Sequence, residues 1–314
     1  YGLTSLIFFL QPLVIHLYIK RYYALDRQIH YDVEPIKQKW NGVAQHIAAV
    51  ILSSSDSIVL TTFSTLVNVS IYTVYYLPMS GARLMIMSMI SGIEAVIGNL
   101  WAKQDLAELR KVFAWTEWSI HTGTTLIFTL TAILIVPFVQ VYTHGVNDAN
   151  YIQPLFGVLL VAANSGHCLR LPYNIMILAA GHYKQTQHNY IIAAVMNIVI
   201  SIIGVKQFGL IGVALGTLAA MVYQTVWMAW YNSKNFIQWP MKNFFKQIGV
   251  DAVSAVGIFA IGSYFSLSAV GYLSWVILAM KVTACGIIVA LLINYVFYKR
   301  FMLEITDKLM KRFC

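Results

Sequence analysis

The chain has 314 residues, of which 59% are hydrophobic and 11% are charged, and its formal net charge is +9. Soluble domains have about 45 to 50% apolar and about 25% charged residues, so this composition excludes an ordinary soluble globule. The apolar residues form blocks long enough to cross a hydrocarbon layer, which requires about 20 helical residues. The sequence therefore predicts an all-α integral membrane protein.

About nine transmembrane helices are expected from these apolar blocks and from the turn and charge signals between them. Most connections are short, and the two longer polar ones cover residues 20–39 and 232–247. The expected spans are 1–19, 41–66, 69–98, 113–141, 152–180, 188–205, 209–231, 248–266 and 271–298.

The lysines and arginines predict the orientation of these spans. Of the 21 cations, 17 lie on one alternating set of connections, and only Lys206 lies on the opposite set. Cytoplasmic loops are the ones enriched in Lys and Arg, so the C-terminus should lie in the cytoplasm and Tyr1 outside. The same placement explains the basic net charge without a nucleic-acid partner.

The three cysteines, Cys168, Cys285 and Cys314, are scattered and show no metal-ligand or CxxC spacing. Neither a disulfide framework nor a metal site is expected from them, and no cofactor is expected. The chain begins at Tyr1, without Met and inside an apolar stretch, so an N-terminal part is expected to be missing from it.

A polar stripe follows the expected helix 41–66. Gly42, Gln45, Ala49, Ser53 and Asp56 recur at helical intervals and lie on one face, which turns apolar beyond Asp56. A lipid-facing carboxylate would cost about 2.5 to 3.5 kcal/mol on insertion scales. The stripe therefore predicts a cavity that closes near the middle of the membrane.

Two further spans carry charges at a similar depth. Arg83 lies near the middle of span 69–98, and Glu94, eleven residues later, is expected on nearly the same face. Span 152–180 carries Arg170, and Pro172 should kink the helix there by removing a backbone hydrogen bond. The other polar residues of this span recur at helical intervals, namely Asn164, His167 and Asn174.

These charges allow two interpretations. An ion-pair network that fixes helix packing needs no ligand. However, two guanidinium groups against Asp56 leave about one positive charge uncompensated, which favours an anionic ligand held by Arg83 and Arg170. Lys281 is a weaker candidate, and Glu117 with His121 is interpreted as a local i, i+4 pair rather than a proton relay.

An enzyme is not expected. Neither GxSxG, HExxH nor a P-loop occurs, and the external loops are short. A channel is disfavoured because the buried charges are single residues on different helices. A transporter with a site among interrupted helices near the midplane fits this pattern better.

Two stretches resemble a known family. They are AAVILSSSDSIVLTTFSTLVNVSIYTVYYLPMSGARL and LRLPYNIMILAAGHYKQTQHNYIIAAVMNIVISIIGVKQFGLIGVALGTLAAMVYQTVWMAW. The first places an Asp mid-helix before a short turn and a Tyr-rich helix. The second combines a Pro-containing helix, AAGHYKQTQ, an Asn-bearing helix and FGLIGVALGT. Both resemble the polysaccharide transporter branch of the multidrug/oligosaccharidyl-lipid/polysaccharide superfamily, in particular its Wzx-like repeat-unit flippases.

The resemblance implies a fold of two six-helix lobes and two extra helices. In those terms residues 1–19 would be the last helix of a missing first lobe, 20–40 a cytoplasmic linker and 41–231 the second lobe. Residues 232–247 would form a cytoplasmic loop, 248–298 the extra helix pair and 299–314 a basic cytoplasmic tail.

The function implied by the resemblance is flipping of undecaprenyl-pyrophosphate-linked oligosaccharides across a bacterial cytoplasmic membrane, for capsule, exopolysaccharide or O-antigen synthesis. Membrane lipids and other polysaccharide-assembly proteins would be the partners. Arg83 and Arg170 would hold the headgroup, Asp56 would balance them, and Glu94 and His167 would tune the approach, with Asn164, Asn174 and Gln45 nearby. The alternatives are a cation-coupled drug exporter of the same superfamily and a membrane glycan polymerase or ligase.

Overall fold

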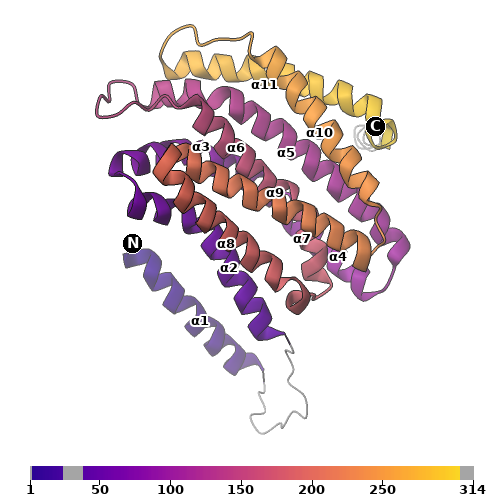
Figure 1. The fold of residues 1–314 in the computed structure, drawn as a ribbon. Coiled ribbons are helices and arrows are strands. Elements are labelled where there is room, and N and C mark those ends of the chain that lie inside the picture. The colour runs from indigo at the N-terminus through magenta and orange to yellow at the C-terminus, as the bar shows by residue number, and fades with distance from the viewer. Residues whose placement is uncertain (1, 24–37, 305–314) are drawn as a thin grey trace. The chain divides into compact units, whose positions relative to one another are not determined.

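The structure, a computed structural model, describes residues 2–23 and 38–304. Throughout these two ranges the regular elements are all helices (Figure 1). The chain divides into two units, Tyr1–Lys39 and Trp40–Cys314, and the first unit contains helix α1, Gly2–Tyr22. The prediction of an all-α membrane protein is confirmed. Most of the expected linker 20–40 and residues 305–314 of the expected tail lie outside the described residues.

The second unit contains ten helices among its described residues. Their bounds are α2 Lys39–Phe63, α3 Leu66–Ser88, α4 Ser91–Ala102, α5 Leu106–Tyr142, α6 Pro154–Leu169, α7 Leu171–Ala179, α8 Tyr183–Phe208, α9 Leu210–Asn235, α10 Met241–Gly262 and α11 Tyr272–Phe297.

Within the described part of the chain, eight helical segments are long and apolar enough to cross a membrane. They correspond to eight of the nine expected spans. The remaining expected span, 1–19, is helical in α1 but is not one of the eight.

Two of the eight segments are interrupted. The expected kink near Pro172 is confirmed, because α6 ends at Leu169, Arg170 forms the turn and α7 begins at Leu171. The expectation of one continuous helix over 69–98 was wrong. The amides of Met89 and Ile90 bond to carbonyls three residues back, at 3.1 Å each, so a tight turn separates α3 from α4.

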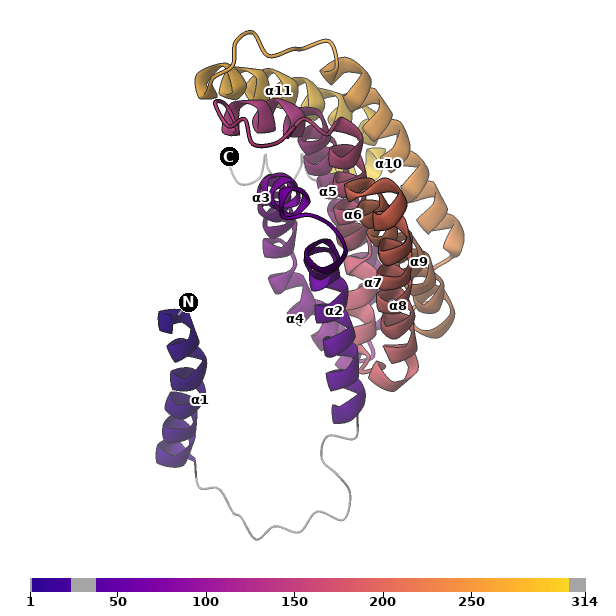
Figure 2. The ribbon, with the colours of Figure 1, turned by 60° about the vertical axis from the view of Figure 1, so that its left-hand side comes forward.

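Helix α9 packs mainly against α8 and α6, and Figure 2 shows α8 and α9 side by side. Gly209 joins α8 to α9 with a positive φ of 56°, a conformation that glycine adopts without steric cost. The two helices approach closely through small residues: a Cβ on Gly204 would lie 2.8 Å from the Cα of Gly212, and Ser201 faces Gly216. Small residues at such crossings let membrane helices pack tightly.

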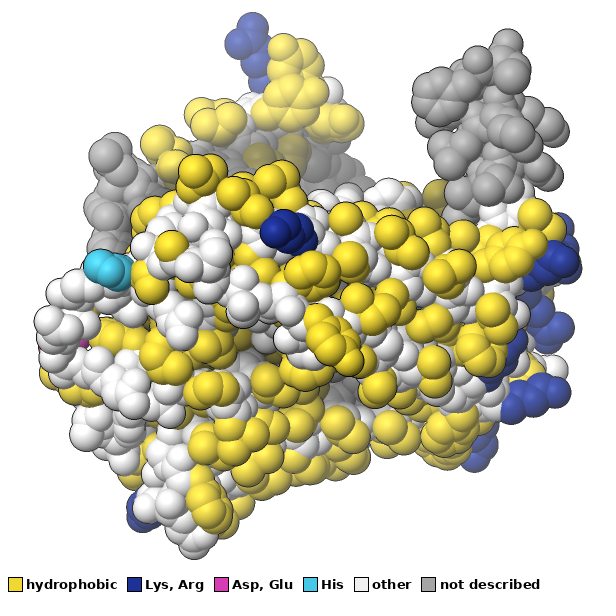
Figure 3. Space-filling model, turned by 90° about the horizontal axis from the view of Figure 1, so that it is seen from above, with side chains coloured by type: hydrophobic (Ala, Val, Ile, Leu, Met, Phe, Trp, Pro, Cys, Tyr) yellow, Lys and Arg dark blue, Asp and Glu magenta, His cyan; other side chains and the backbone are white. Residues whose placement is uncertain are grey.

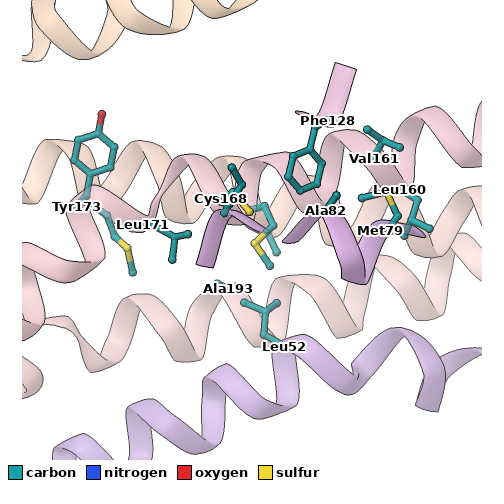
Figure 4. Close-up of a cluster of buried hydrophobic side chains, with 14 of the residues drawn as sticks. Leu52, Met79, Ala82, Phe128, Leu160, Val161, Cys168, Leu171, Tyr173 and Ala193 are labelled. Atoms are coloured by element: carbon teal, nitrogen blue, oxygen red, sulfur yellow. The ribbon is translucent and has the colours of Figure 1, made fainter. Parts of the chain in front are cut away.

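Helix α5 links two packed groups of helices. It contacts α3, α4 and α6 on one side, and α10 and α11 on the other (Figure 1). The main hydrophobic core lies among α2, α3 and α5–α9, and its buried side chains include Leu52, Met79, Phe128 and Leu160 (Figure 4). A smaller cluster joins α5 to α10 and α11, with Leu130, Ile258, Leu278, Val282 and Ala290.

Large hydrophobic side chains cover much of the outer surface. Val256, Leu273 and Val296 are 70%, 76% and 73% exposed. Figure 3 shows one face that is largely hydrophobic, with Lys and Arg gathered toward one end. Such a surface suits contact with lipid rather than water, in agreement with a membrane protein.

The Gly204–Gly212 crossing yields a stability prediction. A Cβ on Gly212 would overlap the carbonyl group of Gly204, so Gly212→Ala should force α8 and α9 apart. Overpacking of this kind costs about 1 to 3 kcal/mol. The thermal unfolding midpoint of the purified protein in detergent should fall by several degrees.

Gly249→Ala in α10 is the matched control, because no atom lies within 4 Å of its added Cβ. Its unfolding midpoint should stay unchanged or rise slightly, since Ala favours helix over Gly. Equal midpoints for Gly212→Ala and Gly249→Ala would contradict the close approach.

Candidate functional site

A cavity of about 350 Å³ lies among α2, α3, α6, α7 and α9. Asp56, Arg83 and Arg170 all line it, as predicted from their depths. Asn164, His167 and Asn174 line it as well. Six of the eight residues singled out in the sequence thus meet at one cavity.

Arg170 is held in place at the break between α6 and α7. Its side chain is buried, its Nη1 donates to Gln224 Oε1 at 2.6 Å, and its Nη2 lies 3.0 Å from His167 Nδ1. A guanidinium group can only donate, so Nδ1 of His167 must accept and this imidazole is neutral. The ring centroid of Tyr190 lies 6.0 Å from Arg170 Cζ, within cation–π range.

Arg83 lies in the last third of α3 and is half-buried. It lines the cavity, yet within residues 38–304 no hydrogen bond or ion pair occupies its guanidinium group. Arg83 is therefore the cation of the cavity that is positioned to meet a ligand.

Asp56 is the centre of a hydrogen-bond network that joins four helices. Its Oδ1 accepts from Thr217 Oγ1 at 2.6 Å, and its Oδ2 lies 3.4 Å from the hydroxyl of Tyr72. Thr217 in turn accepts from Asn197 Nδ2 at 2.8 Å, and Asn197 Oδ1 accepts from the hydroxyl of Ser55. Neutral groups from α3, α8 and α9 thus hold this carboxylate of α2.

Asp56 was expected to balance the charge of Arg83 and Arg170. Among the described residues it forms no ion pair with either arginine. No Asp56 oxygen lies within ion-pair distance of Arg83 or Arg170. The three charges share a cavity without neutralising one another by contact, which leaves both guanidinium groups facing a net positive space.

Two predicted residues lie away from the cavity lining. Gln45 is buried on α2 but does not line the cavity. Glu94 was expected on the same face as Arg83. It lies on α4, beyond the turn at Met89 and Ile90, and it is exposed and does not line the cavity. Lys281 is also exposed and does not line this cavity.

Several lining residues were missed in the sequence. Tyr72 and Tyr76 precede Arg83 at positions i and i+4 of the same helix face, so their spacing could have identified them. Thr217 and Gln224, the partner of Arg170, are single polar residues in the apolar helix α9, and no pattern singles them out.

A second polar cluster is buried among α5, α7 and α10. Glu117 Oε1 accepts from the hydroxyl of Tyr173 at 2.6 Å, and its Oε2 accepts from Trp239 Nε1 at 2.8 Å. The same hydroxyl lies 3.4 Å from Nε2 of His121, whose Nδ1 lies 2.6 Å from Asp251 Oδ2. Glu117 and His121 therefore meet through Tyr173, and not as the isolated local pair that their spacing indicated.

In this cluster, His121 of α5 and Asp251 of α10 share a hydrogen. A deprotonated carboxylate cannot donate, so the 2.6 Å contact between Asp251 and His121 requires a hydrogen held by one of them. Gln247 Nε2 donates to the other Asp251 oxygen at 3.1 Å. A hydrogen shared by His121 and Asp251 thus joins α5 to α10 in the interior. Across residues 2–23 and 38–304 no group of three or more His, Cys, Asp or Glu residues could hold a metal ion.

The sequence was compared with protein-family models and with curated proteins. No protein-family model matches the chain, and no curated protein matches it significantly. The function is therefore argued from the residues of the two clusters and the cavity.

The His121–Asp251 contact yields a stability prediction. Asp251→Ala removes one partner of a buried pair and leaves His121 Nδ1 without its partner and Gln247 Nε2 without its acceptor. Breaking a buried pair in this way costs about 3 to 5 kcal/mol. The unfolding midpoint in detergent should fall by many degrees.

The control is Glu108→Ala, which removes an exposed pair with Lys111 at 3.0 Å. Surface pairs contribute about 0 to 1 kcal/mol, so this midpoint should move little. Comparable shifts for the two variants would contradict the buried cluster as described.

Proposed function

We propose that this protein is a transporter that flips an anionic lipid-linked oligosaccharide, such as an undecaprenyl-pyrophosphate-linked repeat unit, by alternating access. The observation that carries the proposal is the charge of the cavity. Arg83 and Arg170 line one space from two different helices, and the single carboxylate there, Asp56, bonds to Thr217 and Tyr72 instead of either arginine.

The physical argument concerns the uncompensated charge. A buried cation without a counter-ion is costly in a membrane, so such residues mark ion or substrate pathways. Arg is suited to bidentate contact with phosphate or carboxylate oxygens. A cavity of about 350 Å³ also falls in the size range of sites that hold small molecules or headgroups. A pyrophosphate-linked sugar supplies the negative charge that this cavity lacks.

The roles of the residues follow from their contacts. Arg83, free of protein partners in the described chain, would contact the anionic group first. Arg170, held by Gln224 and His167, would supply a fixed second charge. Asn164 and Asn174 line the same space with amide groups suited to sugar hydroxyls. The break at Arg170 places its guanidinium group at an interrupted helix, as in many transporter sites.

The proposal includes a location. The protein would be a multi-pass component of a bacterial cytoplasmic membrane with its C-terminus in the cytoplasm, because the cations gather on one set of connections. It would serve capsule, exopolysaccharide or O-antigen synthesis together with other polysaccharide-assembly proteins. An exporter of cationic drugs should have a net acidic cavity, so the two arginines disfavour that alternative.

The first test is polymer export in cells that make the protein as their source of this activity. Arg83→Ala should reduce export strongly, because a charge-assisted contact contributes about 1.5 to 3 kcal/mol, or about tenfold to a hundredfold in affinity. Arg170→Ala should reduce export as well. Arg83→Lys should retain part of the activity, because it keeps the charge but loses the bidentate contact.

Lys206→Ala, an exposed cation outside the cavity, is the matched control and should export normally. Protein levels in the membrane are compared by immunoblot. Normal export by both Arg83→Ala and Arg170→Ala at equal levels would overturn the cationic site. Accumulation of complete repeat units on the inner leaflet distinguishes a flippase from a polymerase, whose loss lets single units reach the surface.

The second test measures the cavity charge without the substrate. Ser53 is exposed and lines the cavity, so Ser53→Cys in a chain with its three native cysteines replaced should react with methanethiosulfonate reagents. The negatively charged reagent should react several-fold faster than the positively charged one, since the nearby field attracts anions. Arg83→Gln should remove most of this preference, and a preference for the cationic reagent would contradict the proposed charge.

A further inference from the structure

A second cavity, of about 530 Å³, lies between the first part of α5, the start of α10 and the end of α11. No residue lines both this cavity and the one containing Arg83. Its walls are aromatic: the ring centroid of Phe301 lies 4.7 Å from that of Trp115 and 5.4 Å from that of Trp118. Trp118 is buried and fixed by donation to Asn294 Oδ1 at 2.8 Å.

The opening of this cavity is strongly basic. Its lining contains five cations and two carboxylates, namely Arg110, Lys111, Lys246, Lys299, Arg300, Glu117 and Glu304. Figure 3 shows Lys and Arg gathered toward one end of an otherwise hydrophobic face. The excess of positive charge indicates an anionic ligand.

The carboxylates do not neutralise this excess. Glu117 is buried, and its oxygens are occupied by Tyr173 and Trp239. Glu304 pairs with Arg300 at 3.0 Å.

Three cations of the lining are left over. Lys111 pairs with Glu108, outside the lining. Arg110, Lys246 and Lys299 have no carboxylate within 4.0 Å among residues 38–304. Arg110 donates to the Ile237 carbonyl at 2.8 Å. Lys246 donates to the Phe297 carbonyl at 3.4 Å and lies 4.5 Å from the centroid of the Tyr298 ring. Lys299 lies 5.8 Å from the centroid of the Tyr295 ring. The charges of these three cations are therefore not balanced by a carboxylate contact within the described chain.

The position of the cavity identifies the kind of anion. Helix α5 has 37 residues and is about 55 Å long, which exceeds a hydrocarbon core of about 30 Å, so its ends reach the level of the lipid headgroups. Outside the opening, α10 and α11 expose apolar side chains such as Phe245 and Val296, which are 61% and 73% exposed. A ligand here meets cations at one end and an apolar surface beside it.

We propose that this cavity binds the phosphate headgroup of an anionic phospholipid, with Lys246 and Lys299 contacting the phosphate and the aromatic walls contacting the glycerol and upper acyl chains. Basic pockets between membrane helices near the cytoplasmic surface are suited to such headgroups. The inference is independent of the proposed transport function, because it uses none of the residues assigned to the substrate cavity.

Native mass spectrometry of the purified full chain in detergent tests this proposal. The protein is titrated with dioleoylphosphatidylglycerol and, separately, with dioleoylphosphatidylcholine. The wild type should retain the anionic lipid preferentially. Lys246→Ala/Lys299→Ala should lower the affinity for phosphatidylglycerol about thirtyfold, and leave phosphatidylcholine binding unchanged.

Lys103→Ala/Lys242→Ala is the matched control. It removes two exposed lysines, one just before α5 and one in the first turn of α10, that do not line the cavity. Phosphatidylglycerol binding should therefore be retained. Lys246→Arg/Lys299→Arg should also retain it, which excludes misfolding as the cause of a loss. Equal losses in the two double-alanine variants, or no loss in either, would overturn the site.

A third titration uses inorganic phosphate, which shares the anionic group but has no acyl chains. Under the proposal, millimolar phosphate leaves phosphatidylglycerol bound. If phosphate displaces the lipid, or raises the unfolding midpoint in a manner lost in Lys246→Ala/Lys299→Ala while the lipid does not, the occupant is a soluble anion and the lipid assignment is overturned.

Discussion

The need to satisfy polar groups away from water governs the arrangement of this protein. A hydrogen-bonding group without a partner is expensive in an apolar medium, so a buried polar side chain that bonds across helices fixes their relative position. Asp56 is the clearest case. Tyr72 from α3 and Thr217 from α9 meet its two oxygens, and Asn197 from α8 extends the network through Thr217. The depth and rotation of α2 are therefore set by hydrogen bonds as well as by its apolar face.

The interruption between α6 and α7 serves two polar regions at once. Pro172 lacks an amide hydrogen, so the helix cannot continue unbroken past it, and Arg170 occupies the turn. One turn later, Tyr173 enters the cluster of Glu117 and His121. The nine residues of α7 thus connect the cationic cavity to the buried cluster of Glu117, His121 and Asp251. A displacement of this short helix would alter both regions together, so the two regions are coupled through α7.

Sequence patterns predicted the apolar spans and the depths of Asp56, Arg83 and Arg170, because helical periodicity and hydrophobic length are local properties. They did not predict the turn at Met89 and Ile90 that precedes Glu94, since no Pro marks it. They also failed to predict the hydrogen-bond partners of Asp56 and Arg170. Thr217 and Gln224 lie in a helix rich in Ala and Gly, and only the fold brings them to Asp56 and Arg170.

The glycine crossing between α8 and α9 has a consequence for how the cavity could open. Because Gly204 and Gly212 already touch through their backbones, the two helices cannot slide past each other and should move as one rigid body. Thr217 and Asn197, one on each helix, then keep their separation when the α8–α9 hairpin moves. Under the proposed transport function, the contact that changes would be the hydrogen bond from Thr217 to Asp56, and α2 would move against this hairpin.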